Sequence, residues 1–255
     1  MKRVLTAAAL IPLVIYVVLW APAWLFWMVV AACGCLSYRE YNTIAETYGF
    51  GAPGPLGYAL GLLALAPWVE PWLVIAATAL LALTVTMRSA DLAKSLPRAA
   101  LLVVGVVYVF CGWRAAIPLH ERNPHWLMYA LLVSWAGDIG AYYVGRTLGR
   151  HRLAERVSPK KSWEGAAASV VTAVLLAGAY LVYVARQGSI LQAVLLTAVA
   201  NIAGQFGDLA ESSMKRGAGV KDSGALLPGH GGFLDRVDST LFVLPIVYIY
   251  LRLIG

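Results

Sequence analysis

The chain has 255 residues, a formal net charge of +7, 60% hydrophobic residues and only 13% charged residues. A soluble domain carries about 25% charged residues, so this composition excludes a soluble globular protein and indicates that lipid surrounds most of the chain. The positive charge is therefore a poor indication of nucleic-acid binding, because basic residues of membrane proteins collect in cytoplasmic loops.

Nine apolar segments can be drawn as helices that cross the hydrocarbon core of a membrane. In chain order they cover roughly residues 4–21, 23–38, 55–69, 71–87, 99–119, 125–145, 163–185, 189–213 and 234–254. The basic start followed by an apolar run resembles a signal peptide. A second apolar run begins directly after Pro22, however, which favours a helical hairpin broken at that proline. We therefore expect an all-α polytopic membrane protein with about nine transmembrane helices.

The distribution of basic residues indicates the orientation of these helices. If the N-terminus lies inside, the inside loops are 39–54, 88–98, 146–162 and 214–236, and with the N-terminus they hold sixteen of the twenty Lys and Arg residues. This asymmetry predicts a cytoplasmic N-terminus and polar chemistry at the cytoplasmic membrane border. We expect residues 1–120 to form scaffold helices and residues 121–255 to form the catalytic region, with cytoplasmic loops 146–162 and 214–236.

Acidic residues gather in the second half of the chain, in or beside predicted helices. Charges within a membrane span are costly unless they are paired, hydrated or bound to ions. Asp138 lies in the sixth span among Gly137, Gly140 and Gly145, which allow another backbone or a ligand to come close. Asp138 is either a helix-packing residue or an active-site carboxylate in a hydrated cavity, and we favour the second interpretation.

Two further groups of acids share helix faces at the cytoplasmic border. Asp208, Glu211 and Ser212 lie at the end of the eighth span, and Asp235 and Asp238 lie three residues apart at the start of the ninth. Carboxylates on one face require a counter-charge, and Mg²⁺ prefers oxygen ligands and often binds only one or two carboxylates. Acids that complement a helix macrodipole are the alternative. We predict Asp208, Asp235 and Asp238 as metal ligands.

The loop between these two helices combines cations with six glycines. Its basic residues are Lys215, Arg216 and Lys221, and Asp222 is a further acid in it. Cations and exposed backbone N–H groups beside metal-binding acids suit a polyphosphate, although the P-loop motif does not occur. His230 is either a structural residue or a donor to a phosphate oxygen.

The other basic loop, 146–162, ends in Ser158, Pro159, Lys160 and Lys161. The lysines either anchor the loop at the membrane interface or bind phosphates and anionic lipid head groups. Ser162, the next residue, can cap the seventh helix.

The segment from Ser212 to Asp238 resembles the signature of the phosphatidate cytidylyltransferase family, also called CDP-diglyceride synthases. The signature reads S-x-hydrophobic-K-R-x4-K-D-x-small-x2-hydrophobic-P/G/S-x-H-G-G-hydrophobic-x-D-R-hydrophobic-D, and this sequence matches it without a departure. Upstream, WAGDIGAYYVGRTLG, SPKKSWEG and FGDLAESSMKR are also similar to blocks of the family, with Ser162 where Thr is more usual. The resemblance is specific over about residues 130–240.

The resemblance implies transfer of a cytidylyl group from CTP to phosphatidic acid, releasing pyrophosphate and CDP-diacylglycerol for phospholipid biosynthesis. It also implies a divalent ion, generally Mg²⁺, with K⁺ used by at least one member, and a homodimer. In a bacterium the protein would be a multi-pass protein of the inner membrane. No nucleic-acid partner is expected.

The resemblance and the residue chemistry together predict the roles of the site residues. The residues expected to act in catalysis, by neutralising phosphates or stabilising the pyrophosphate leaving group, are Lys215, Arg216, Lys221, His230 and Arg236. Asp222 is also expected in catalysis, and with Asp138 it is the next candidate for a metal ligand. Those expected to bind substrate are Asp138, Ser158, Lys160, Lys161, Ser212, Gly231 and Gly232.

Two other functions are weighed against this one. A CTP-dependent polyprenol or dolichol kinase would transfer the γ-phosphate to an alcohol, but the KD…HGG…DRxD string favours the cytidylyltransferase. An ion-coupled transporter also carries acids and glycine-broken helices within the membrane. It fits less well because the polar residues lie at the cytoplasmic ends of the spans and the sequence holds no inverted repeat.

Overall fold

The computed structural model describes residues 2–50, 54–226 and 231–254, with side chains described from residue 10 onward. The described chain is helical apart from one small hairpin, as the composition predicts. Its contacts divide it into two compact units. The first contains Ala23–Arg114 and Met214–Arg236 with the first three residues, and the second contains Val4–Pro22, Ala115–Ser213 and the chain from Val237.

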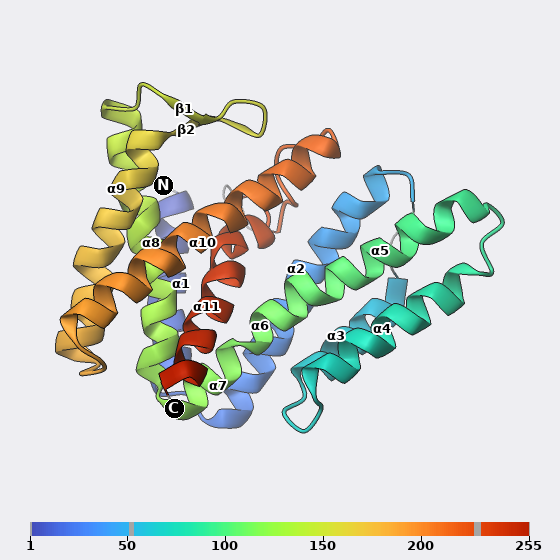
Figure 1. The fold of residues 1–255 in the computed structure, drawn as a ribbon, viewed down its shortest axis with the longest axis horizontal. Coiled ribbons are helices and arrows are strands. Elements are labelled where there is room, and N and C mark those ends of the chain that lie inside the picture. Colours follow the sequence, from blue (N-terminus) through green and yellow to red (C-terminus); the bar gives the residue numbers. More distant parts are fainter. Residues whose placement is uncertain (1, 51–53, 227–230, 255) are drawn as a thin grey trace. The chain divides into compact units, whose positions relative to one another are not determined.

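The first unit is built from helices of the N-terminal half and one later segment. Its elements are α2 (Ala23–Thr47), α3 (Gly54–Leu65), α4 (Pro71–Thr86), η1 (Leu92–Lys94), α5 (Ser95–Gly105), the π-helical η2 (Val106–Cys111), α6 (Gly112–Arg114) and η5 (Leu234–Arg236). Within this unit α4 packs along α5, and α3 packs against η2 (Figure 1). α4 begins at Pro71, because the fixed φ of proline suits the first turn of a helix.

Aromatic side chains fill the interior of the first unit. The fully buried Phe110 lies in the π-helical stretch against Gly34 of α2 and Gly61 of α3, where any side chain would collide with its ring. Tyr38 packs beside it, with the two ring centroids 5.3 Å apart. Small residues on α2 and α3 thus allow these helices to close around a large ring.

Arg114 lies within the predicted span 99–119, and the structure gives it a role. Its guanidinium donates to the carbonyl oxygens of Ala64 at 2.5 Å, Ala66 at 2.8 Å and Val69 at 2.8 Å. These carbonyls lie in and just after the last turn of α3, where the helix leaves acceptors without helical partners. Arg114 therefore closes the C-terminal end of α3.

Replacing Arg114 with Met is expected to destabilise the protein by about 3 kcal/mol, because hydrogen bonds to a charged donor are lost at buried carbonyls. The apparent melting temperature in detergent should fall by several degrees. Arg252→Met is the control, since Arg252 is exposed in α11. Equal melting temperatures for the two variants would contradict the capping role.

The second unit is centred on one long helix. Its elements are α1 (Lys2–Leu19), α7 (Ala116–Arg122), α8 (Pro124–Thr147), β1 (Arg152–Ala154), β2 (Ser158–Ser162), α9 (Trp163–Ala173), the π-helical η3 (Val174–Gly178) and η4 (Tyr180–Val184), α10 (Ile190–Gly217) and α11 (Asp238–Ile254). Within the unit α8 packs against α7, α9, η3 and α11. The boundary between the units falls inside α10, between Ser213 and Met214.

Glycines on α8 allow close packing of this unit. A side chain at Gly140 would meet the Ala168 carbonyl and Thr172 of α9, and one at Gly137 would meet Asn201 of α10. The sequence allows either another backbone or a ligand to approach these glycines, and the structure places neighbouring helices there.

The basic loop 146–162 forms structure that the sequence does not predict. β1 and β2 pair in an antiparallel hairpin between the end of α8 and the start of α9 (Figure 1). Ser162, at the end of β2, accepts a hydrogen bond from the Gly165 N–H at 3.2 Å, which confirms it as the N-cap of α9.

The helix lengths support an integral membrane protein. Among the described residues, four helical stretches are long and apolar enough to cross a membrane: Leu92–Arg122, Pro124–Thr147, Trp163–Val184 and Ile190–Gly217. Leu10–Leu19, Gly54–Leu65 and Pro71–Thr86 are shorter apolar helices. The nine-span topology, its orientation and the division at residue 120 stay predictions.

Candidate active site

Of the residues that match the signature, Met214–Arg236 lie in the first unit, and this part is called the signature segment below. It begins on the last turn of α10. The helix ends in a turn in which the Val220 N–H donates to the Lys215 carbonyl at 2.9 Å and Gly219 adopts a φ of +71°. Glycine takes this left-handed conformation without steric cost. Lys215 and Arg216 therefore lie on the end of a helix, where cations complement the macrodipole, rather than in the loop expected from the sequence.

A buried ion pair joins the two ends of the signature segment. The Nζ of Lys215 donates to Oδ1 of Asp235, and both side chains are only 9% exposed. Removing one partner of such a pair leaves an uncompensated buried charge, which is strongly destabilising. The sequence predicts both residues in the site, Lys215 as a phosphate-binding cation and Asp235 as a metal ligand, but it does not predict their contact.

Backbone donors hold the second oxygen of Asp235. Its Oδ2 accepts the N–H of Gly232 at 2.8 Å and the N–H of Ser223 at 3.1 Å. Burial raises the pKa of Asp235, but the Lys215 ammonium and the two backbone donors outweigh burial and hold the pKa below its usual range. The carboxylate is thus ionised at neutral pH, and it organises the loop around itself.

Glu40 of α2 provides a second buried carboxylate, and the sequence analysis did not identify it. It is 6% exposed, and its Oε2 accepts the Leu234 N–H at 2.7 Å and the Ser223 hydroxyl at 2.8 Å. Its Oε1 accepts the Phe233 N–H at 2.9 Å. The sequence places Glu40 in a polar loop, whereas α2 continues to Thr47. The available signal was an acid between aromatic residues, in SYREYN, just where the apolar helix could continue.

The two carboxylates explain three glycines of the signature segment. A side chain at Gly224 would collide with the Glu40 carboxylate, and one at the buried Gly232 would collide with the Glu40 carboxylate and the Ser223 hydroxyl. Gly231 has a φ of +81°, and a Cβ there would lie 2.9 Å from Oδ2 of Asp235. These glycines let the backbone approach both anions closely.

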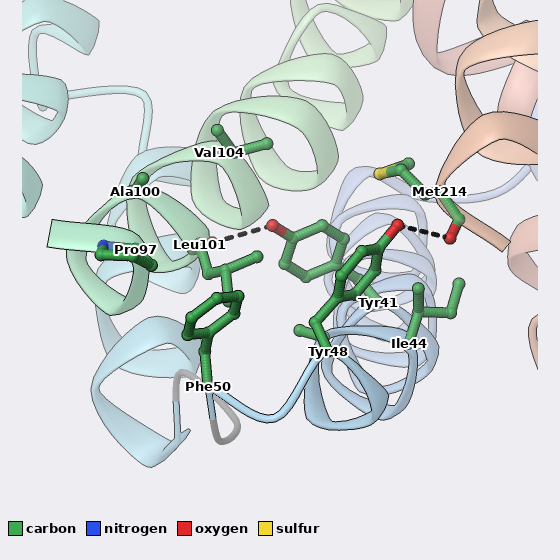
Figure 2. Close-up of a pocket in the computed structure, with 10 residues that line it drawn as sticks. Tyr41, Ile44, Tyr48, Phe50, Pro97, Ala100, Leu101, Val104 and Met214 are labelled. Carbon is green, nitrogen blue, oxygen red and sulfur yellow. Dashed lines mark hydrogen bonds between the residues drawn. The ribbon is translucent and has the colours of Figure 1, made fainter. Parts of the chain in front are cut away.

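An apolar cavity of about 300 Å³ lies beside the start of the signature segment (Figure 2). Its lining comes from α2 and the residues that directly follow it, from α5 and from Met214. Figure 2 shows two tyrosine hydroxyls bonded at its wall: Tyr48, directly after α2, donates to the Met214 carbonyl at 2.8 Å, and Tyr41 of α2 donates to the Leu101 carbonyl at 2.9 Å. Tyr48 thus holds the beginning of the signature segment, and Glu40 of α2 holds its end.

The remaining predicted residues of the signature segment lie at its surface. Arg216, Lys221, Asp222 and Arg236 are exposed. Exposed cations next to a buried ion pair are accessible to a soluble nucleotide. His230 lies outside the described residues.

The second unit brings together predicted residues from two distant segments. The Nζ of Lys161, on β2, lies 2.5 Å from Oδ2 of Asp208 on α10, and the Ser212 hydroxyl donates to Oδ1 of Asp208 at 3.3 Å. Ser158 and Lys160 lie on the same strand as Lys161, and Lys160 is exposed. The hairpin therefore brings Lys161 to the acidic face that the sequence predicts on this helix.

The deeper part of the polar stripe on α10 packs against neighbouring helices. Gln205 donates to the Ala166 carbonyl of α9 at 3.1 Å and to the Asn201 side chain at 2.9 Å. Asn201 in turn donates to the Val133 carbonyl of α8 at 3.4 Å. These two residues join helices, and only the end of the stripe near Asp208 carries charge.

Asp238 begins α11 close to the acidic end of α10. It is 7% exposed, and its Oδ1 accepts the Ser239 N–H at 2.7 Å. A side chain at Gly207 would collide with the Asp238 carbonyl, so α11 starts against the residue that precedes Asp208.

Asp138, which the sequence predicts as a substrate-binding residue, is exposed on α8 in the same unit.

Comparison with known proteins decides the family. The sequence profile described as the cytidylyltransferase family matches residues 1–254. The chain belongs to the cytidylyltransferase family.

Relatives of this chain align over nearly all or part of its length. A protein of Staphylococcus aureus (strain COL) named phosphatidate cytidylyltransferase is 32% identical over 260 residues, which cover 98% of each chain. A protein of the same name from Staphylococcus haemolyticus is 42% identical over 153 residues, and that match spans 60% of this chain and 59% of the relative's length. A third, from Staphylococcus saprophyticus, is 38% identical over the same share.

The cytidylyltransferase family match includes the helices before residue 120 as well as the signature segment. Glu40 and Tyr48 therefore lie within the region that this chain has in common with the family profile. The first unit and the second each carry part of the predicted site.

The candidate metal ligands of this cytidylyltransferase lie in both units, Asp235 in the first and Asp208 and Asp238 in the second. Among the residues that the structure describes, no three His, Cys, Asp or Glu side chains form a group that could hold a metal ion. Lysine ammonium groups face two of the three aspartates, Lys215 at Asp235 and Lys161 at Asp208.

Proposed function

We propose that this cytidylyltransferase transfers the cytidylyl group of CTP to phosphatidic acid, giving CDP-diacylglycerol and pyrophosphate. The observation that carries the proposal is the match of residues 1–254 to the cytidylyltransferase family. Relatives that align over 98% of their length carry the name phosphatidate cytidylyltransferase. The long apolar helices suit an acceptor that is itself a membrane lipid.

The acceptor in this reaction needs no activating base. The phosphate monoester of phosphatidic acid loses its second proton near pH 6, so its oxygen is an anionic nucleophile at neutral pH. That oxygen forms a bond to the α-phosphorus of CTP, while the bond from the α-phosphorus to the bridging oxygen of the β-phosphate breaks and its electron pair leaves with pyrophosphate. Catalysis therefore depends on in-line positioning and on neutralising phosphate charge.

The cations of the signature segment are the proposed binding groups for CTP. Three exposed cations contact its phosphates in this proposal: Arg216, Lys221 and Arg236. Asp222, which is also exposed, lies next to Lys221 in the chain. Lys215 exchanges part of its contact with Asp235 for a phosphate oxygen. The Gly231 N–H and the side chain of His230 complete the site for the leaving pyrophosphate. Gly232, whose own N–H is donated to Asp235, lets the backbone come close there.

The hairpin of the second unit is the proposed binding surface for the lipid phosphate. Lys160 and Lys161 provide the positive charge, and Ser158 and Ser212 provide hydroxyl donors. Asp138 lines the polar approach from α8. Lysines at a membrane border also attract the anionic head groups among which the acceptor lies.

Mg²⁺ is the proposed cofactor, with Asp208, Asp235 and Asp238 as its protein ligands. All three offer the hard oxygen ligands that this ion prefers, and the ammonium groups of Lys161 and Lys215 would have to give up oxygens of Asp208 and Asp235 when it binds. When bound, the ion would neutralise charge on the transferring phosphate. K⁺ as a further cation, a homodimer and a cytoplasmic position of the site follow only from the family resemblance and the loop charges.

Purified protein in liposomes that contain phosphatidic acid tests the function. With CTP and Mg²⁺ it should release pyrophosphate and form CDP-diacylglycerol in equal amounts, and a chelator of divalent ions should stop both. Release of CDP together with a phosphorylated polyprenol would instead support the lipid kinase. Ion flux without turnover of CTP would support the transporter.

A further inference from the structure

We propose that Glu40 is a positioning residue of the cytidylyl-transfer site. From a helix of the N-terminal half, it fixes the backbone of the signature segment at Phe233 and Leu234, and with it the contact between Asp235 and Lys215. This role rests on the proposed function, because Glu40 acts through residues assigned to phosphate and metal binding.

A continuous hydrogen-bond network connects Glu40 with the ion pair. The Ser223 hydroxyl donates to Glu40 at 2.8 Å and accepts the Asp235 N–H at 3.3 Å. The Ser223 N–H donates to the Asp235 carboxylate at 3.1 Å, and Lys215 donates to the same carboxylate. Ser223 is therefore held by both anions, and a shift of Glu40 is transmitted to Asp235 through it.

The chemistry of Glu40 favours this role over helix packing alone. A buried carboxylate costs free energy unless hydrogen bonds compensate it, so an apolar side chain would serve packing better. The three hydrogen bonds described for Glu40 all come from the signature segment. The Glu40 carboxylate also occupies the space that a side chain at Gly224 or Gly232 would need. The segment is thus shaped around Glu40.

Glu40→Gln tests the proposal with a side chain of the same shape. Oε1 and Oε2 each accept a backbone N–H, so either orientation of the Gln amide sets its NH₂ against the Phe233 or the Leu234 N–H. We expect kcat to fall about 10- to 100-fold, as for a small misplacement of reacting groups, while KM for CTP changes less than about threefold. Glu46→Gln, at an exposed acid on the same helix, should retain wild-type kcat.

A double mutant distinguishes action through Ser223 from an independent effect. If Glu40 acts through that hydroxyl, Ser223→Ala in the Glu40→Gln background should reduce kcat much less than it does in the wild type. Effects that multiply would contradict the network. Wild-type kcat in Glu40→Gln would overturn the proposal outright.

Hydrogen exchange provides a readout that does not depend on turnover. Glu40→Gln should accelerate amide exchange in peptides that cover residues 223–235, with unchanged exchange in α8 and α9. Acceleration throughout the protein would indicate general destabilisation and overturn the positioning role. If the wild-type protein shows no transfer from CTP, the proposed function fails, and the exchange pattern alone then decides whether Glu40 anchors the segment.

Discussion

Replacing Asp238 with Asn is expected to reduce kcat by about 10²- to 10³-fold while the protein stays folded in detergent. Asn keeps the shape of the side chain and can still accept the Ser239 N–H that Asp238 accepts at 2.7 Å. What it loses is the negative charge at a side chain that is 7% exposed, at the start of α11 where the backbone passes Gly207. A divalent cation requires that charge, whereas the hydrogen bond from Ser239 does not.

A matched aspartate provides the control for this prediction. Asp91 caps η1 and, like Asp238, accepts a nearby backbone N–H, that of Ala93 at 3.1 Å, but it lies in an exposed pair with Lys94. Asp91→Asn should leave kcat and the melting temperature near wild type. If Asp238→Asn turns over at the wild-type rate at saturating CTP and Mg²⁺, Asp238 is not a metal ligand.

Lys215→Met is expected to lower both activity and stability. The change leaves the carboxylate of Asp235, 9% exposed, without its ammonium partner, and breaking a buried pair in this way costs about 3–5 kcal/mol. Transfer should fall by about 10²-fold or more, because a cation at the phosphates is also lost. Activity and melting temperature are measured in the same detergent preparation.

Two further variants separate the two effects of Lys215. Lys94→Met removes an exposed partner 3.7 Å from Asp91, and it should change stability by less than about 1 kcal/mol. Adding Asp235→Asn to Lys215→Met removes both buried charges, so it should restore much of the melting temperature without restoring transfer. Full activity in Lys215→Met at a temperature where it is folded would contradict the phosphate-binding role.

Hydropathy and proline positions predicted the helices of the second half closely. The spans expected at 125–145, 163–185 and 189–213 correspond to Pro124–Thr147, Trp163–Val184 and Ile190–Gly217. A long apolar stretch predicts a helix from its own residues alone, because a segment in lipid must satisfy its backbone hydrogen bonds within itself. Helix ends beyond the apolar run are less predictable, and α2 and α10 both continue into stretches that read as polar loops.

The partners of the buried charges could not be predicted from local patterns. Glu40 and Ser223 are separated by 183 residues, and neither the acid nor the serine has a spacing that points to the other. The same holds for Lys161 and Asp208, which the sequence predicts in the site but on separate segments. Residue chemistry therefore identified the charged positions, while their pairing depends on tertiary packing.

Because Glu40 lies on α2 and Tyr48 directly follows that helix, the signature region is not an autonomous module. A fragment or graft that begins after residue 120 would carry every letter of the signature but neither of the two side chains that hold its ends. Exchange of catalytic halves between members of the family should thus succeed only when α2 is inherited together with the segment it holds.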